Sequence, residues 1–438
     1  MKRVVFLFVI LLALAFAVPA MAESGTFRNV TWTYEKGTLT ISGEGVIEEE
    51  GPWSEYKKQV KNLVFCGDNL QISAWFSGYK NVKTLTLGNG VVATDDYVFQ
   101  NLGAKKYTLI VQDNDYQWNT YSFVPININA VKLGEMVSNY AVDGQFVLTG
   151  ERDTLLMCFG SSKNVLSVPE TVEKLGARVF CRSGAKEIRL PRGLRVIEDE
   201  AFAGCSNLQQ ITIPGTVTTI GSGVFSGCKK LKAINFVNLT ITTDYKLTPD
   251  YFMELNALKT LIIPNYTDIS EMCITVCKAT ESIIVSEGNK KLNGYNGTLY
   301  SGMSKLKSVY LPASLEDIST KNIPYQKNTK LYVLEGTYAH QFAMDNGYPF
   351  ELVKPISNVK LSEETLMLKV NQTAKLKASI EPIDASAQKV QWISTDESVA
   401  TVTEGKVKAI GSGDCEIICR GLDCGGVSAI CAVTVLPK

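Results

Sequence analysis

Residues 201–236 read AFAGCSNLQQITIPGTVTTIGSGVFSGCKKLKAINF and carry the same pattern twice. Phe202 is followed by Cys205, and 23 residues further on Phe225 is followed by Cys228 at the same spacing. A leucine lies three positions after each cysteine, and an isoleucine lies six positions after it. Two interpretations are open: a catalytic or redox constellation that is built twice, or one structural unit that is stacked on a copy of itself.

The pattern F-x-x-C-x-x-L-x-x-I-x-I-P recurs outside this stretch. Further copies begin at Phe76, Phe252 and Ile274, and a copy shortened by one residue begins at Phe180. The cysteine position holds Leu255 in one copy and Tyr79 in another. A redox or metal site needs sulfur in every copy, whereas a packing position needs only a small or apolar side chain. We therefore interpret Cys205, Cys228 and Cys277 as structural cysteines of the core.

A period of 22 to 24 residues is typical of a solenoid. Each unit buries its apolar positions only against its neighbours, so the core runs continuously through the stack. The alternation in "ITI" predicts one short strand per turn, with Ile211 and Ile213 facing inward and Thr212 facing outward. The predicted fold class is therefore mainly β, with a solenoid built around a parallel sheet.

Residues 190–228, LPRGLRVIEDEAFAGCSNLQQITIPGTVTTIGSGVFSGC, resemble the BspA-like leucine-rich repeat family of bacterial surface proteins. VTWTYEKGTLTISGEGVIEEEGPW is similar to that family's N-terminal cap, and GTYAHQFAMDNGYPFELV to its closing helical cap. YAVDGQFVLTG and YNGTLYSG resemble its β-hairpin insertions. The resemblance implies a right-handed solenoid over residues 23–354, and a role in attachment or recognition rather than catalysis.

After Pro355 the pattern changes to short alternating segments separated by turn-forming residues, which predicts a β-sandwich over residues 355–438. Trp392-Ile393-Ser394 before ESVATV, followed by GKVKAIGSG and AVTV, resembles the bacterial Ig-like group 2 domain. That resemblance implies a spacer or an adhesion module on an exported protein. Asn371 stands where this family has glycine, so we expect a turn residue at positive φ there.

Four cysteines fall in the predicted sandwich. By alternation, Cys419 and Cys431 face inward, and a hairpin turn centred near Gly425 would place them opposite each other on neighbouring strands. Two alternatives follow for this pair: a disulfide, or two small buried thiols beneath Trp392.

The N-terminus carries a targeting signal. Lys2 and Arg3 precede an apolar run from Val4 to Val18, and Ala20-Met21-Ala22 supplies a small-x-small cleavage site, so residues 1–22 are predicted to be a secretory signal peptide. No later segment is long and apolar enough to cross a bilayer. We expect a secreted or cell-surface associated, extracellular bacterial protein without a membrane span after cleavage.

Composition argues against several classes of function. Lys and Arg number 44 and Asp and Glu number 44, so no charge excess favours nucleic acid as a partner. The single histidine, His340, excludes paired-histidine metal sites, and it falls in the predicted closing cap as a surface imidazole. No phosphate-binding or nucleophile-elbow motif occurs. We expect no enzyme, no cofactor and no metal. A glycan hydrolase stays open as an alternative, since a carboxylate pair is spatial and leaves no mark in sequence. It is the least favoured one, because histidine is nearly absent and the repeat and sandwich patterns occupy the chain.

The outward residues of successive predicted strands form a ladder along the sheet, and this ladder is the candidate binding surface. In order they are Val64, Thr86, Arg189, Thr212, Asn235, Ile262, Ile284, Tyr310 and Tyr332. The later part is apolar and aromatic, and such exposed strips mark interaction sites. We hypothesise that Ile262, Ile284, Tyr310 and Tyr332 line a docking face for a protein or glycan on a host or neighbouring cell surface. The alternative is that the protein's own insertions cover the sheet there.

A second candidate is the aromatic segment DYQWNTYSF. Its members Tyr116, Trp118, Tyr121 and Phe123 could stack on sugar rings, or they could anchor an irregular segment to the core. The sequence therefore favours an exported recognition or adhesion protein that binds through its solenoid sheet, with a carbohydrate- or cell-wall-binding protein as the alternative.

Overall fold

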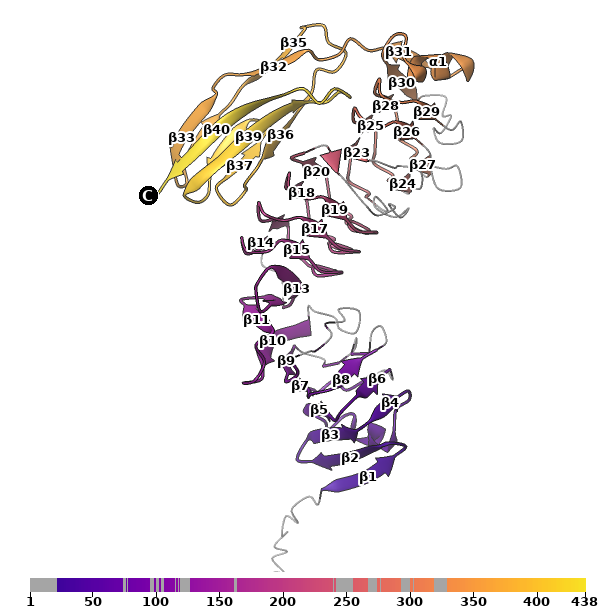
Figure 1. The fold of residues 1–438 in the computed structure, drawn as a ribbon, viewed down its shortest axis with the longest axis vertical. Coiled ribbons are helices and arrows are strands. Elements are labelled where there is room, and N and C mark those ends of the chain that lie inside the picture. The colour runs from indigo at the N-terminus through magenta and orange to yellow at the C-terminus, as the bar shows by residue number, and fades with distance from the viewer. Residues whose placement is uncertain are drawn as a thin grey trace, which may run out of the picture.

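The computed structural model describes residues 22–73, 76, 78–94, 98–99, 102–103, 106–114, 116, 118, 127–160, 164–238, 240–241, 255–266, 274–275, 277–292, 300–301, 303–318 and 329–438. Apart from Ala22, the expected signal peptide lies outside these residues. The chain forms a solenoid of about 11 turns, with a β-sandwich beside its C-terminal half (Figure 1). The predicted fold class is confirmed. No helix among the described residues combines the length and apolarity that a bilayer span requires.

The N-terminal cap is an antiparallel meander that leads directly into the parallel stack. The first sheet runs in the order β1 (Glu23–Phe27), β2 (Val30–Glu35), β3 (Thr38–Gly43), β5 (Asn62–Cys66), β7 (Thr84–Leu87), β9 (Tyr107–Val111) and β10 (Ile128–Leu133). A short second sheet holds β4 (Gly45–Ile47), β6 (Leu70–Ile72) and β8 (Val91–Ala93). The one-turn helix η1 (Pro52–Tyr56) buries Trp53 and closes the open end of this core.

A hairpin interrupts the stack in the middle of the chain. β11 (Tyr140–Asp143) pairs antiparallel with β12 (Phe146–Thr149), as the sequence of this insertion predicts. The coils then resume in two parallel ladders. One holds β13 (Thr154–Cys158), β15 (Lys174–Leu175), β17 (Val196–Ile197) and β19 (Thr219–Ile220). The other holds β14 (Val165–Ser167), β16 (Glu187–Arg189), β18 (Gln210–Ile213) and β20 (Ala233–Phe236).

The last coils carry a five-stranded parallel sheet and the closing helix. The sheet holds β22 (Thr260–Ile263), β25 (Ser282–Val285), β28 (Ser308–Tyr310), β30 (Lys330–Val333) and β31 (Phe350–Leu352). Two-stranded pairs form between β21 (Thr240–Ile241) and β23 (Asn265–Tyr266), β24 (Ile274–Thr275) and β27 (Tyr300–Ser301), and β26 (Lys291–Leu292) and β29 (Asp317–Ile318). The predicted insertion YNGTLYSG lies mostly outside the described residues.

Helix α1 (Tyr338–Asp345) forms the closing cap, and His340 has a structural part in it. The hydroxyl oxygen of Thr337 caps the helix by accepting a hydrogen bond from the His340 amide at 3.3 Å. The Nδ1 atom of His340 accepts a hydrogen bond from the Gly336 amide at 3.2 Å. The imidazole is thus held against the preceding turn.

The repeated phenylalanines and cysteines form the spine of the solenoid core. The rings of Phe180 and Phe202 stack with centroids 5.4 Å apart, and those of Phe202 and Phe225 with centroids 5.6 Å apart. The Cys205 thiol donates to the main-chain oxygen of Phe180 at 3.0 Å, and Cys228 makes the same bond to Phe202 at 3.2 Å. Each thiol therefore links its own coil to the previous one. Cys277 is also fully buried.

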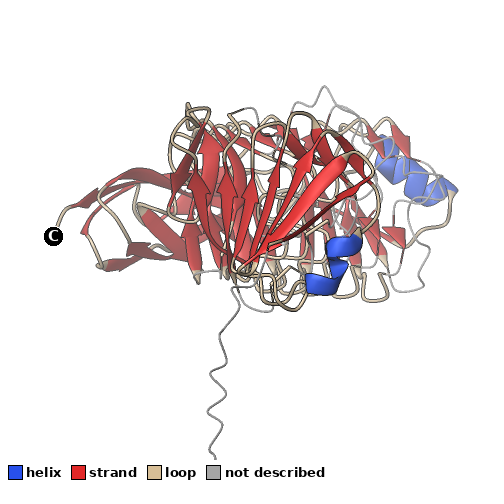
Figure 2. Ribbon diagram, turned by 90° about the horizontal axis from the view of Figure 1, so that it is seen from below, coloured by secondary structure: helices blue, strands red, loops and turns tan. Residues whose placement is uncertain are grey.

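The C-terminal sandwich has two main sheets and a separate strand pair. One sheet holds β33 (Thr365–Lys369), β40 (Ser428–Leu436), β39 (Gly413–Gly421) and β36 (Val390–Ser394). The other holds β34 (Thr373–Lys375), β38 (Lys406–Ala409) and β37 (Ala400–Thr403). β32 (Asn358–Leu361) pairs with β35 (Ala378–Glu381). Figure 2 shows the sandwich projecting to one side of the column of coils. Asn371 has a φ of 75°, as the sequence predicts.

The prediction that Cys419 and Cys431 face each other is wrong. Cys419 pairs with Ala429, Cys431 pairs with Ile417, and both thiols are free. The β39–β40 turn is centred one residue earlier than Gly425, and this moves every partner by two positions. The second of the two alternatives therefore holds, since both side chains are buried.

Candidate functional site

The outward ladder that the sequence predicts is in register in the last coils. Ile262 pairs with Ile284, Ile284 with Tyr310, and Tyr310 with Tyr332 on adjacent parallel strands. We call these four residues the apolar strip. The rings of Tyr310 and Tyr332 stack with centroids 4.4 Å apart and 14° between their planes. The strip is therefore one continuous column of side chains on the outer face of the sheet.

The sandwich covers most of the apolar strip. It lies along the side of the solenoid that carries β18 to β28 (Figure 1), and it leaves Ile262 only 8% and Ile284 only 3% exposed. Tyr310 packs against the cluster that includes Ile356 of the sandwich, and burial raises the pKa of Tyr310 to about 12. Tyr332 is half-buried. The sequence left open whether the protein's own insertions cover the strip; the C-terminal sandwich provides the cover.

A chain of hydrogen bonds crosses between the sheet and the sandwich. Gln391 Nε2 donates to Asn235 Oδ1 at 2.9 Å, and Asn235 Nδ2 donates to Thr212 Oγ1 at 3.4 Å. Thr212 Oγ1 in turn donates to Glu397 Oε1 at 2.8 Å. Burial raises the pKa of Glu397, while the hydrogen bond from Thr212 opposes that rise. The network thus runs from the sandwich through two ladder residues and back to the sandwich.

Charged groups fix the sandwich to the ends of neighbouring coils. Arg420, which is 6% exposed, donates to the main-chain oxygens of Phe236 and Val237, each at 2.7 Å, and burial lowers the pKa of Arg420 to about 10. Arg192 Nε lies 3.1 Å from Asp396 Oδ2.

A further main-chain contact ties the later coils to the sandwich, because the Glu287 amide donates to the main-chain oxygen of Cys424 at 3.0 Å.

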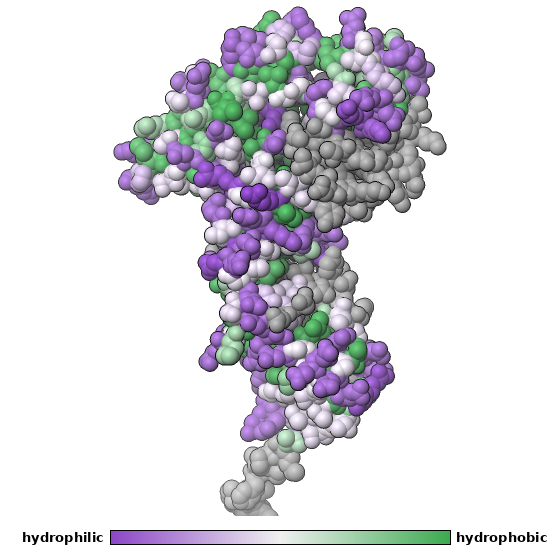
Figure 3. Space-filling view, viewed as in Figure 1, coloured by the Kyte–Doolittle hydropathy of each residue, from purple (hydrophilic) through white to green (hydrophobic). Residues whose placement is uncertain are grey.

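Packing between the two parts is incomplete. A cleft of about 270 Å³ remains between them, with Ile262 and Asn235 on the solenoid wall and Trp392 on the sandwich wall. Among the described residues, the buried Gln391 Oε1 has no hydrogen-bond partner. On the face drawn in Figure 3, the surface that borders the junction of the sandwich and the column is mainly hydrophilic, with a few hydrophobic residues. This polar, imperfectly filled contact is of the kind found between domains that move relative to each other.

The second candidate, the aromatic segment, lies largely within the core. Tyr116 is 1% exposed, so its ring cannot present a face to a sugar, and for this residue the binding interpretation is wrong. Trp118 is partly buried and meets the rings of Tyr116 and Tyr140 edge-on, with centroids 5.2 and 5.5 Å apart. Tyr121 and Phe123 lie outside the described residues. Within the described part, the segment anchors an irregular stretch of chain.

Several residues of the contact between the solenoid sheet and the sandwich could not be identified from the sequence. Thr212 and Asn235 stand on the predicted ladder but are polar, and nothing in the pattern marks them as partners of residues more than 150 positions away. Arg420 is at an outward position of β39, in phase with Asp414 and Glu416, so the alternation gives no sign of its buried contact.

A coil such as that of β16 and β17 carries two short strands, not the single strand that the alternation predicts. A stack of such coils is the architecture of a leucine-rich-repeat protein. Residues 56–143, 157–247 and 238–335 match the sequence model of the BspA type leucine rich repeat region, in six copies. These residues make up more than half of the chain, which therefore belongs to the BspA type leucine-rich repeat family. Residues 355–419 match the bacterial Ig-like domain, group 2.

Solved structures of similar fold come from several bacteria. A leucine-rich repeat protein from Eubacterium ventriosum is 18% identical, with 72% of this chain and 86% of that chain covered, at a TM-score of 0.39. The pneumococcal vaccine antigen PcpA is 13% identical, with 76% of this chain and 99% of that chain covered, at a TM-score of 0.40. A leucine rich cell surface protein from Faecalibacterium prausnitzii is 15% identical, with 75% of this chain and 94% of that chain covered, at a TM-score of 0.31. Among curated proteins, none matches.

Proposed function

We propose that this chain is an exported recognition or adhesion protein, secreted or held at the cell surface, that binds a protein or surface ligand through its solenoid sheet. Membership of the BspA type family and the predicted signal peptide support export to the surface. The observation that carries the proposal is the apolar strip, because its side chains point out of a core that is complete without them. We propose no catalytic activity.

The ligand would reach the strip by displacing the sandwich. Ile262 and Ile284 are too deeply covered to be touched while the sandwich is in place, whereas Tyr332 lies half-buried at the end of the strip. Displacement relieves two unfavourable features of the docked state, the desolvated Arg420 charge and the unpaired Gln391 Oε1. A ligand that fills the strip must also replace the apolar burial and the hydrogen bonds that the sandwich supplies.

A reversible lock tests this function in the full chain. Glu287→Cys places a thiol beside native Cys424, whose main-chain oxygen accepts the Glu287 amide hydrogen. We expect oxidation to abolish binding of a partner captured from host or bacterial surface fractions, and reductant to restore it. The matched control carries Glu287→Cys with Cys424→Ser and cannot form the lock. Equal affinity of the oxidised and reduced forms would exclude the covered strip as the binding surface.

Replacement of the two stacked tyrosines supplies a second test. Tyr310→Ser with Tyr332→Ser removes the aromatic part of the strip, and we expect weaker binding of the same partner. Unchanged binding by this variant would remove these residues from the site.

Carbohydrate or cell-wall binding is the second candidate, and the half-buried Trp118 favours it, since indole rings stack well on sugars. Binding on a glycan array that Trp118→Ala abolishes would support this candidate. Turnover of a glycan by the purified protein would instead revive the hydrolase alternative.

A further inference from the structure

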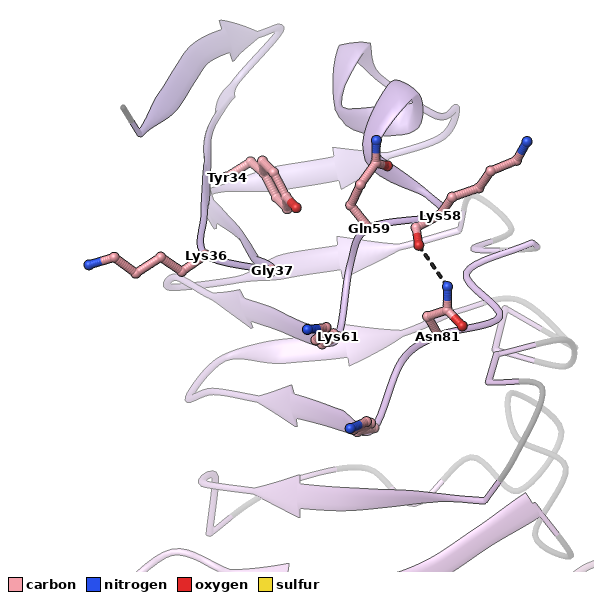
Figure 4. Close-up of a pocket in the computed structure, with 8 residues that line it drawn as sticks. Tyr34, Lys36, Gly37, Lys58, Gln59, Lys61 and Asn81 are labelled. Carbon is pink, nitrogen blue, oxygen red and sulfur yellow. Dashed lines mark hydrogen bonds between the residues drawn. The ribbon is translucent and has the colours of Figure 1, made fainter. Parts of the chain in front are cut away.

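A basic hollow lies at the N-terminal end of the solenoid, on the edge where the strands begin (Figure 4). Its volume is about 590 Å³. It is lined by Tyr34, Lys36, Gly37, Lys58, Gln59, Lys61, Asn81 and Lys83. This edge is distinct from the outer sheet face that carries the apolar strip, so the hollow is independent of the function proposed above.

Two lysines occupy the same position in adjacent coils of this hollow. Lys61 directly precedes β5 and Lys83 directly precedes β7, whose first residues are paired in register. The Lys83 amide donates to the Lys61 main-chain oxygen at 2.7 Å, so the two side chains start about 5 Å apart, the spacing of paired strands. Both side chains are exposed. Two positive charges are therefore held side by side by the backbone.

At four other places on the solenoid, opposite charges on adjacent coils form ion pairs. These join Lys174 to Glu198 at 2.5 Å, Lys307 to Glu281 at 2.7 Å, Lys330 to Glu351 at 2.9 Å and Lys290 to Glu316 at 3.1 Å. In each of them a carboxylate on the neighbouring coil offsets the lysine charge. Lys61 and Lys83 differ from these four lysines, because neither has a carboxylate partner among the described residues.

At the positions in register with the two lysines, the flanking coils carry no carboxylate. The positions in register with them are Gly37 on the preceding coil and Tyr107 on the following coil. Among the described residues, none of Lys58, Lys61 and Lys83 forms an ion pair. Lys36 pairs only with its exposed neighbour Glu35. Like charges on neighbouring strands are destabilising, and a bound anion would remove that repulsion.

The remaining groups of the hollow suit a ligand rich in hydroxyl groups. The Tyr34 ring is held by stacking on Tyr56, with centroids 4.3 Å apart. Asn81 Nδ2 donates to the Lys58 main-chain oxygen at 2.7 Å, which orients the amide and leaves Asn81 Oδ1 as an acceptor (Figure 4). The Gln59 amide supplies a further donor and acceptor.

Gly37 keeps the floor of the hollow open. Its φ is +84°, and a Cβ there would lie 3.4 Å from Lys61 Cδ. The alkyl part of Lys61 therefore lies along bare backbone at Gly37.

We propose that this hollow binds an acidic oligosaccharide, with Lys61 and Lys83 each contacting the carboxylate of a successive sugar. A chain of uronic acid rings carries one charge per ring, and a pyranose ring is about as long as the spacing between coils. Tyr34, Gln59 and Asn81 then meet the ring face and the hydroxyl groups. The neutral hydrogen-bonding groups favour this ligand over an acidic peptide.

Calorimetric titration of the full chain with tetragalacturonate tests the proposal. We expect binding that weakens with added salt, and a loss of at least about tenfold in Lys61→Gln with Lys83→Gln, because two charge-assisted hydrogen bonds are removed. Both side chains are exposed, so circular dichroism should be unchanged. The matched control is Lys186→Gln with Lys259→Gln, two exposed lysines that directly precede β16 and β22 on the same edge, and it should retain wild-type affinity.

Four outcomes would overturn the proposal. These are no binding of tetragalacturonate by the wild type, an equal loss in both double variants, equal affinity for neutral maltotetraose, and tighter binding of tetraglutamate than of tetragalacturonate. None of these outcomes depends on the state of the apolar strip, so they are distinct from failure of the proposed function.

Discussion

Arg420 donates a hydrogen bond of 2.7 Å to the main-chain oxygen of Phe236 and thereby joins the sandwich to the strand end of a coil 184 residues away in sequence. The same guanidinium also donates to Val237, so the contact uses main-chain acceptors that any residue at these positions would supply. These hydrogen bonds form only when the sandwich is docked on the solenoid, so replacement of Arg420 perturbs the docking directly.

Arg420→Met should release the sandwich from the apolar strip. Loss of two hydrogen bonds from a charged donor removes about 2 kcal/mol or more of docking energy, although removal of a desolvated charge offsets part of it. Hydroxyl-radical footprinting of Tyr310 measures the outcome, because this ring becomes exposed when the sandwich leaves. Arg195→Met, at an exposed arginine of the solenoid, is the control. Unchanged protection of Tyr310 in Arg420→Met would show that the contact is dispensable.

Acidification should tighten the docking through Glu397. Burial raises the pKa of this carboxyl in the docked state, with Glu187 and Asp396 adding to the rise and Thr212 and Arg189 opposing it. The docked state therefore holds its proton more tightly, so docking gains stability as pH falls through the raised value and is weakest above it.

Footprinting of Tyr310 at neutral and mildly acidic pH checks this dependence. Glu397→Gln should flatten the profile, and the comparison separates Glu397 from Glu170, whose pKa burial also raises. A profile that is the same in wild type and variant would assign the dependence to another group.

Phe202→Ala should destabilise the whole solenoid. Its ring lies fully buried between those of Phe180 and Phe225, so truncation leaves a cavity at two coil interfaces and costs about 3–5 kcal/mol. Since neighbouring coils share their stability, denaturant unfolding should shift to lower concentration for the repeat as a whole. Phe202→Leu, which refills most of the space, should lose less. Equal losses in the two variants would argue against stacking as the source of stability.

The core cysteines should resist alkylation in the native protein. Burial raises the pKa of Cys277 to about 11 and that of Cys419 to about 12, and it also raises the pKa of Cys205 well above the ordinary value of a thiol. Mass spectrometry after iodoacetamide at mildly alkaline pH should find these thiols unmodified until denaturant is added. Prior reduction should leave the pattern of the denatured protein unchanged, because Cys419 and Cys431 are free. A peptide joined through this pair would contradict the β39–β40 register.

The coils could be predicted because each one contains its own signal. Ile211 and Ile213 face the core in the structure as the alternation predicts, and both are buried. The same argument holds for the other coils whose strands the structure describes, since a strand's inward positions depend on local periodicity and on contact with the next copy. The ladder register from Ile262 to Tyr332 follows from that regularity.

The partner of the ladder could not be predicted in the same way. Exposure of Ile284 depends on where the sandwich lies, and no period of the sequence encodes a contact between domains. Alternation placed Cys419 and Cys431 on inward positions but could not fix their partners, because the centre of a turn sets the register. Tyr116 illustrates the third limit, since an aromatic residue in an irregular segment is equally compatible with a core or a surface.

The fold-back of the sandwich determines how the molecule bears load. The sandwich follows the last coil in sequence, yet Arg420 and Glu397 fasten it to the ends of β20 and β18 in the middle of the stack. Tension applied at the C-terminus is therefore shared between the chain connection that follows β31 and these fastenings to the central coils. Once the fastenings break, the chain connection to the last coil bears the whole load.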